Sequence, residues 1–274
     1  MTDRAEQGTG MDARLHRQLA DELLTARRGR RPVPRISARH PGFTLGDAYA
    51  VQRELRALEE ADGAVVVGYK IGATSEAIQR MFGIDQPDFG YLTDRMMLLD
   101  GCCVDADRFI APKVEGELAF RLGEDLAGDS VTARDVLDAS SEVLPALEIC
   151  DSRIEHWDIG LVDTVADNAS SAMAVLGPPV PPDGTDLAAE QMVFQAGEHV
   201  QTASGSAVMG HPAEAVACLA RILASYGTGI TAGQVVLAGA WAGAVDLLPG
   251  SPVKASFGRL GSVSLTVDTR DSDG

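Results

Sequence analysis

Apolar residues near the start of the chain recur at the spacing of an α-helix. Between residues 12 and 28, leucine returns at every fourth position, at Leu15, Leu19 and Leu23, which places an apolar stripe along one helix face. A second helical pattern begins near Thr44 and runs to Glu60, after a Pro-rich connector at residues 31–34. The pattern therefore predicts a helical N-terminal part.

After Gly63 the pattern changes to short apolar runs bounded by Gly, Pro and Asp, which is typical of strands. Strands are predicted at residues 64–71, 114–120, 144–150, 173–176, 192–196, 235–237, 252–257 and 263–267, and helices at 132–139 and 212–226. We expect a helical subdomain (1–62), a mixed β-rich body (63–268) and a disordered tail (269–274). Residues 1–10 are polar and are also expected to be frayed, because they have few apolar groups to offset ordering entropy.

Charge and composition exclude several classes of protein. Lys+Arg 23 against Asp+Glu 40 gives a net charge of −17, which repels nucleic acid and anionic membranes. Neither a secretory signal nor an apolar run of about 18 residues is visible. The four cysteines show no C-x-x-C spacing, which argues against a disulfide framework and a zinc knuckle. We expect a cytoplasmic protein with no nucleic-acid or membrane partner.

Six arginines between residues 27 and 39 run against the acidic trend. No aromatic residue interleaves them, so a solvated or intersubunit surface is favoured over a phosphate-binding arm.

Carboxylates on two predicted strands suggest chemistry. In the segment from Val114 to Phe120, alternation places Glu115 and Glu117 on one face; a wet acidic face would explain this segment alone. Glu148, however, interrupts an apolar strand, where a lone carboxylate is costly unless it is paired or bound to a cation. Three converging carboxylates repel one another unless a divalent cation neutralises them, and an all-oxygen set favours Mg²⁺ or Mn²⁺ over zinc.

Three further segments carry polar groups of interest. Lys70 follows a buried-type strand between glycines that let a ligand approach, although a strand-end lysine also reaches solvent. Asp85 and Asp88 lie in a turn-rich stretch, residues 82–90, where they either cap turns or face a pocket. Small polar residues at 163–171 can donate hydrogen bonds to a carboxylate or form an Asx/ST turn. The five histidines show no metal-ligand spacing and are expected to be structural.

Together and in this order, these segments resemble the 2-hydroxypenta-2,4-dienoate hydratase and 4-oxalocrotonate decarboxylase family, a branch of the fumarylacetoacetate hydrolase superfamily. The resemblance covers nearly the whole chain. It is carried by the motifs DAYAVQ (47–52), GYKIG (68–72), DQPDFG (85–90), PKVEGE (112–117), PALEICDSRI (145–154), ADNASS (166–171) and LGSVS (260–264). Each motif alone is weak evidence, but the ordered set is specific.

The resemblance implies a site and a fold. Glu115, Glu117 and Glu148 match the family's metal-binding glutamates, Lys70 and Asp88 match residues that line its active site, and the substrate-contacting loop holds Ser170, with Ser171 as the alternative partner. The implied fold is α+β, a mixed β-roll or barrel-like body with a small helical N-terminal subdomain. Homo-oligomers are implied, as is a complex with a hydratase, decarboxylase or aldolase partner.

The implied reaction is metal-dependent addition of water to 2-hydroxypenta-2,4-dienoate in meta-cleavage aromatic catabolism, giving 4-hydroxy-2-oxopentanoate, with Lys70 and Asp88 as candidate proton carriers. The alternatives are a 4-oxalocrotonate decarboxylase and a noncatalytic partner subunit. The chain departs from the family at residues 237–243, where relatives carry a Ser or Thr and this chain has Leu-Ala-Gly-Ala-Trp-Ala-Gly. We expect Trp241 to narrow the pocket, which leaves the substrate open.

Overall fold

The computed structural model describes residues 11–74, 87–182 and 184–268. Our expectations for residues 1–10, for the tail 269–274 and for Asp85 lie outside the described residues.

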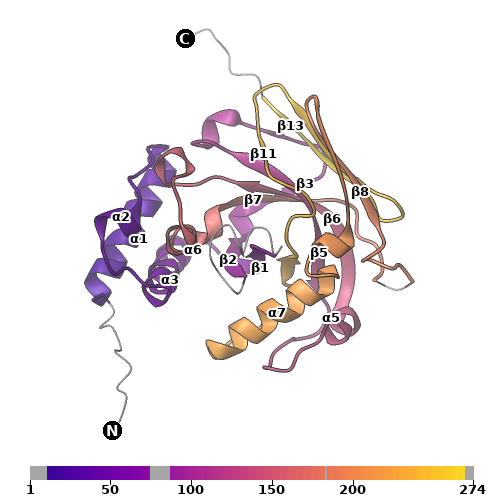
Figure 1. The fold of residues 1–274 in the computed structure, drawn as a ribbon, viewed down its shortest axis with the longest axis horizontal. Coiled ribbons are helices and arrows are strands. Elements are labelled where there is room, and N and C mark those ends of the chain that lie inside the picture. The colour runs from indigo at the N-terminus through magenta and orange to yellow at the C-terminus, as the bar shows by residue number, and fades with distance from the viewer. Residues whose placement is uncertain (1–10, 75–86, 183, 269–274) are drawn as a thin grey trace.

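Two long helices and one short helix form the N-terminal part, at the left of Figure 1: α1 (Ala13–Gly29), α2 (Ile36–Arg39) and α3 (Leu45–Ala61). The helix α3 starts with a capping box, in which Thr44 and Asp47 exchange side-chain and backbone hydrogen bonds. Asp47 also accepts from the backbone N–H of Met11 at 2.8 Å and lies 2.9 Å from His16 Nε2 on α1. This carboxylate therefore ties the two predicted helices together.

The larger sheet has eight strands and carries the site. Its order is β2 (Asp88–Thr93), β1 (Val66–Gly72), β10 (Val235–Leu237), β5 (Lys113–Leu122), β6 (Ser140–Cys150), β7 (Ser171–Leu176) and β3 (Met97–Leu99), and β11 (Val245–Asp246) pairs with β5. The pairs β1–β10 and β3–β7 are parallel and the others antiparallel.

The second sheet has five strands and packs against β5 and β6 of the first. Its order is β4 (Cys102–Val104), β13 (Gly261–Val267), β12 (Pro252–Phe257), β8 (Gln191–Ala196) and β9 (His199–Ser204). The packing is closest at Gly116 on β5, where a Cβ would lie 2.6 Å from Met192 Sδ. The face of β5 that bears Gly116 thus belongs to the core, and the opposite face is free to hold polar groups.

The remaining helices are α5 (Ala133–Ala139), α6 (Leu161–Ala166) and α7 (Pro212–Ser225), with short 3₁₀ turns at Asp94–Met96, Ala106–Arg108, Glu155–Trp157, Asn168–Ser170 and Gly205–Ala207. By length and composition alone, Gly205–Ser225 could cross a membrane. However, α7 packs against α5 and β1 and buries Val216, Leu219 and Leu223. It is a core helix of this fold.

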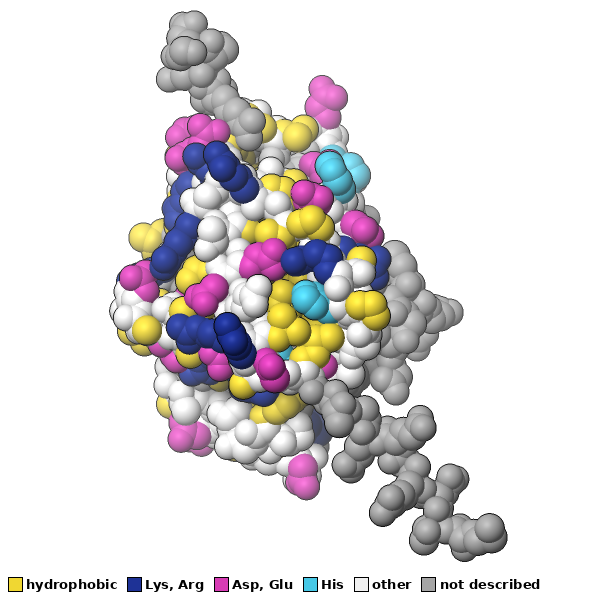
Figure 2. Space-filling view, turned by 90° about the vertical axis from the view of Figure 1, so that its left-hand side faces the viewer, with side chains coloured by type: hydrophobic (Ala, Val, Ile, Leu, Met, Phe, Trp, Pro, Cys, Tyr) yellow, Lys and Arg dark blue, Asp and Glu magenta, His cyan; other side chains and the backbone are white. Residues whose placement is uncertain are grey.

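The arginine-rich segment lies on the helical face, where Figure 2 shows basic side chains interspersed with acidic ones. Arg27, Arg28 and Arg39 pair with Glu59, Asp62 and Glu22, and Arg35 pairs with Asp158 and Asp163. Local carboxylates thus neutralise most of this cluster, which supports the surface interpretation over a phosphate-binding arm.

The α+β fold class predicted from the sequence is confirmed, and each predicted helix and strand has a counterpart. The interpretation of residues 82–90 as turns is wrong from Asp88 onward, because Asp88–Thr93 forms β2 and pairs with β1. The sequence predicts no helix near residue 163, but Leu161–Ala166 forms α6 and includes the start of the polar segment 163–171. The division at residue 62 stays a prediction.

Candidate active site

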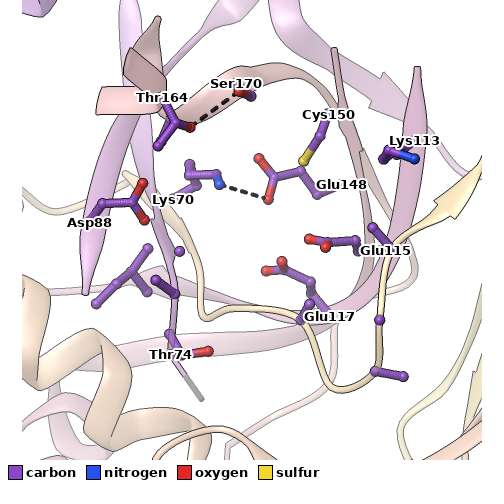
Figure 3. Close-up of a pocket in the computed structure, with 18 of the residues that line it drawn as sticks. Lys70, Thr74, Asp88, Lys113, Glu115, Glu117, Glu148, Cys150, Thr164 and Ser170 are labelled. Atoms are coloured by element: carbon purple, nitrogen blue, oxygen red, sulfur yellow. Dashed lines mark hydrogen bonds and ion pairs between the residues drawn. The ribbon is translucent and has the colours of Figure 1, made fainter. Parts of the chain in front are cut away.

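Strands β5 and β6 place several polar side chains on one face of the sheet. Alternation aligns Lys113, Glu115 and Glu117 along β5, and the register pairs Glu115 with Glu148 and Lys113 with Cys150 on β6. Directly paired residues project to the same side, so the three glutamates meet in one place, as Figure 3 shows. The two acidic segments found in the sequence therefore form a single cluster.

The ammonium of Lys70 reaches this cluster from β1, with Nζ 3.4 Å from Glu148 Oε2. Asp88, at the start of β2, pairs across from Gly72, and its carboxylate points toward Lys70 (Figure 3). A Cβ at Gly72 would lie 2.4 Å from Asp88 Oδ1, so glycine is needed for this approach. Lys70 and Asp88 are both buried.

The backbone after β10 contacts Glu117. The N–H of Gly239 donates to Glu117 Oε2 at 2.9 Å. Gly239 has a φ of +102°, and a Cβ there would lie 2.6 Å from Thr74 Oγ1. The glycine in the divergent 237–243 segment thus has a structural reason, and the segment contributes a backbone donor to the site.

A strained turn presents Ser170. Asn168, Ala169 and Ser170 all have φ between 50° and 54°, the left-handed region that non-glycine residues adopt only when their surroundings hold them. The Asn168 side chain bonds both backbone groups of Tyr91. The buried guanidinium of Arg153 pairs with Asp167 and donates to Ser171 O at 2.9 Å. This network fixes the turn.

Ser170 and Ser171 differ in position. Ser170 lines the cavity, and its hydroxyl lies 3.2 Å from Thr164 Oγ1. Ser171 begins β7, is fully buried, and is absent from the lining. The geometry favours Ser170 of the two predicted alternatives.

Burial and mutual repulsion raise the pKa values of the glutamates. Burial, with the charge of Glu148, raises the pKa of Glu115 to about 7, and burial with both neighbouring carboxylates raises the pKa of Glu117 well above its usual range. Burial also raises the pKa of Glu148, against the opposing charge of Lys70. Burial alone would lower the pKa of Lys70, but Glu148 and its neighbours raise it. The cluster therefore holds three carboxyl groups against the single ammonium of Lys70.

These side chains surround a cavity of about 480 Å³. It is lined by six of the seven predicted site residues, namely Lys70, Asp88, Glu115, Glu117, Glu148 and Ser170. Sequence reasoning missed Lys113 and Cys150, although each lies two residues from a glutamate on its strand and alternation signals both. Nothing in the sequence marks Trp157, Ile159 and Leu161, which reach the cavity from a loop and a helix start.

The donor set fits a hard divalent cation. Glu148 is 0% exposed, and neither of its carboxylate oxygens has a hydrogen-bond partner within the described residues. Ligand atoms of Glu115, Glu148 and Cys150 lie within 4.8 Å of one another, and Glu117 lines the same cavity. Cys150 offers a soft sulfur atom, which a hard cation such as Mg²⁺ disfavours relative to carboxylate oxygen. The carboxylates are therefore the better ligands.

Comparison with known proteins identifies the family of this chain. The family model described as fumarylacetoacetate (FAA) hydrolase C-terminal matches residues 64–268. The chain belongs to the fumarylacetoacetate hydrolase C-terminal family. The match covers both sheets and every residue of the predicted site.

Similar proteins of this family include hydratases and a decarboxylase. A 2-hydroxyhexa-2,4-dienoate hydratase of Comamonas testosteroni is 43% identical over 89% of this chain and 94% of its own length. A 2-oxo-hept-4-ene-1,7-dioate hydratase of Escherichia coli is 38% identical over 92% and 98%. The structure of 4-oxalocrotonate decarboxylase from Pseudomonas putida G7, complexed with magnesium and adipate, has a TM-score of 0.92 at 33% identity and covers 95% of this chain and all of that one. The chain is thus a lyase of the hydratase and decarboxylase group.

Proposed function

We propose that this chain is a metal-dependent hydratase that adds water to 2-hydroxypenta-2,4-dienoate, or to a substituted relative, to give a 4-hydroxy-2-oxo acid. The observation that carries the proposal is the cross-strand pair of Glu115 and Glu148, with Lys70 Nζ 3.4 Å from the latter. Hydratases among the similar proteins give it further support.

Glu115, Glu117 and Glu148 are the residues proposed to hold Mg²⁺ or Mn²⁺. When bound, the cation supplies Lewis-acid polarisation of a 2-oxo acid head group. The environment of Glu148 supports this assignment, because its buried oxygens have no hydrogen-bond partner within the described residues and the ammonium of Lys70 is one positive charge against three carboxyl groups.

Lys70 and Asp88 are proposed to move the protons. Tautomerisation takes a proton from the 2-hydroxyl and places one on C5; hydration then forms the C4–O bond and places a proton on C3. Lys70, whose ammonium reaches into the cluster and faces Glu148, is the donor in this scheme. Asp88, whose pKa burial raises against the charge of Lys70, is the acceptor. Ser170 is proposed to donate a hydrogen bond to the substrate.

The second candidate function is decarboxylation of 4-oxalocrotonate. It is favoured by the close structural match to a decarboxylase complexed with magnesium and adipate. Both reactions draw electrons into a 2-oxo acid head group, so the cluster of carboxylates does not distinguish a hydratase from a decarboxylase. The two activities differ at the far end of the substrate, because the decarboxylase must accept a second carboxylate there.

The test is a pair of assays on the purified chain with Mg²⁺ and with EDTA, one with freshly generated 2-hydroxypenta-2,4-dienoate and one with 4-oxalocrotonate. We expect the first substrate to gain the mass of one water only when metal is present. Release of CO₂ from the second substrate with little hydration of the first would replace the proposal with the decarboxylase. Activity of the chain alone also excludes a noncatalytic subunit.

A further inference from the structure

One part of the cavity wall is apolar. Its side chains are Trp157, Ile159, Leu161, Ala240, Trp241 and Ala242. Trp241 is buried and packs edge-on against Phe257 at a ring-centroid distance of 5.0 Å, so it belongs to a rigid part of the core. A carboxylate placed against these side chains loses its hydration and meets no cation among them; the indole N–H of Trp241, which has no hydrogen-bond partner within the described residues, is a neutral donor.

Two cations, Lys70 and Lys113, occur among the described lining residues, and both are engaged. Lys70 faces Glu148 in the head-group cluster. Lys113 Nζ lies 2.5 Å from Asp246 Oδ1 and 5.5 Å from the centre of the Trp157 ring. An ammonium between a carboxylate and an aromatic face has part of its charge offset, although this pair is partly exposed to solvent.

The pairing of strands fixes the partner of Lys113. The short strand β11 pairs with the start of β5, and its register sets Asp246 directly opposite Lys113. The Leu247 N–H donates to Pro112 O at 2.9 Å and extends this pairing. The Trp157 indole N–H donates to Ala111 O at 2.9 Å, which holds the ring beside the ammonium. Backbone pairing therefore holds Asp246 and Trp157 beside Lys113.

We propose that this enzyme selects 2-hydroxydienoates with an uncharged tail over those that end in a second carboxylate, and that Asp246 enforces the choice by neutralising Lys113. The inference rests on the proposed function and names its substrate class. The similar proteins include both a hexadienoate hydratase and a heptenedioate hydratase. Because both lysines of the described lining face carboxylates, we expect the cavity of this chain to favour a dienoate with one carboxylate.

Binding can be followed apart from turnover, because both tryptophans of the chain, Trp157 and Trp241, line the cavity. Two probes of equal length that cannot be hydrated are 2-oxoheptanoate and 2-oxoheptanedioate. Titrating each into the Mg²⁺-loaded protein while recording tryptophan fluorescence gives two dissociation constants. We expect the monoacid to bind at least about tenfold more tightly.

Two substitutions near the cavity mouth test the role of charge. Asp246→Asn removes the carboxylate that pairs with Lys113. We expect it to reduce the ratio of the diacid and monoacid dissociation constants about three- to tenfold, because the diacid binds more tightly. In the double variant Lys113→Met with Asp246→Asn, the preference returns. At the exposed lining residue Ala244, Ala244→Arg is expected to narrow the preference, whereas the neutral control Ala244→Gln leaves it unchanged.

The kinetic counterpart compares 2-hydroxyhepta-2,4-dienoate with 2-hydroxyhepta-2,4-diene-1,7-dioate by kcat/KM. Equal or better use of the diacid by the wild-type chain overturns this inference and leaves the hydratase proposal intact. An unchanged preference in both Asp246→Asn and Ala244→Arg overturns the role given to charge. Failure to hydrate any dienoate overturns the proposed function itself.

Discussion

Glu148 shows how a single residue can indicate a site. The residues on either side of it, Leu147 and Ile149, are fully buried, as a core strand requires, and Glu148 is buried with them. A carboxylate in this place costs free energy, since water has been removed and neither oxygen has a hydrogen-bond partner in the described chain. Lys70 compensates part of the charge, but Glu115 directly opposite adds to it. A bound cation resolves the imbalance.

Replacing Glu148 with Gln is expected to weaken Mn²⁺ binding by at least about 100-fold, because an amide removes the charge of a proposed direct ligand. Isothermal titration calorimetry measures this affinity. The matched control is Glu142→Gln, on the same strand, where the carboxylate pairs with Arg121 outside the cavity; it should bind Mn²⁺ like the wild type. Unchanged affinity in Glu148→Gln would remove this residue from the metal site.

At the scale of elements, the sequence predicted the strands that carry the glutamates because alternation is a local property. The register that sets Glu115 opposite Glu148 is not local, since it depends on how two separate strands pair. β2 was missed because the turn-forming residues before it obscured its pattern, and its pairing with β1 is a tertiary contact. Trp241 was expected at the pocket, whereas Trp157 escaped prediction because it has a positive φ in the turn at Glu155–Trp157.

The contact between α1 and α3 has a pH dependence that follows from Asp47. Burial would raise the pKa of Asp47, but hydrogen bonds from Thr44, His16 and Met11 outweigh it and lower the pKa from 3.8 to about 2. A carboxylate with a depressed pKa stabilises the folded state above its unfolded pKa, and the stabilisation is lost as pH falls through the folded pKa. Asp47 is thus expected to contribute at most about 2 kcal/mol at pH 7.

We expect Asp47→Asn to lower the free energy of unfolding by at most about 2 kcal/mol at pH 7, and the difference from wild type to shrink as the pH falls from about 4 toward 2. Urea unfolding across this pH range measures it. The exposed Asp21→Asn on α1 serves as control and should change stability by less than about 0.5 kcal/mol. A pH-independent difference would show that the carboxylate charge is not responsible.

At the scale of the molecule, the five-stranded sheet packs on one face of β5. The polar cluster occupies the opposite face (Figure 3). The site therefore draws its parts from distant regions of the chain: β1, β2, the β5–β6 pair, the turn at Asn168–Ser170 and the segment after β10. Because a cation at this point contacts the centre of the sheet, its binding is coupled to the stability of the whole body.

Metal removal is accordingly expected to lower the melting temperature. A cation at 100 times its dissociation constant adds about 2.7 kcal/mol, which raises the Tm of a chain of this size by about 5–10 °C. Differential scanning calorimetry with Mn²⁺ and with EDTA measures the shift, and Glu148→Gln should abolish it. Equal melting temperatures in both buffers would mean that the cluster does not hold a divalent cation.

The most direct test of the central claim is the initial rate of water addition to 2-hydroxypenta-2,4-dienoate as free Mg²⁺ is raised from zero. We expect no turnover in EDTA, a hyperbolic rise to saturation with one cation per chain, and a flat, inactive profile for Glu148→Gln. An undiminished rate in EDTA would contradict the assignment of the glutamates as a metal site that serves hydration.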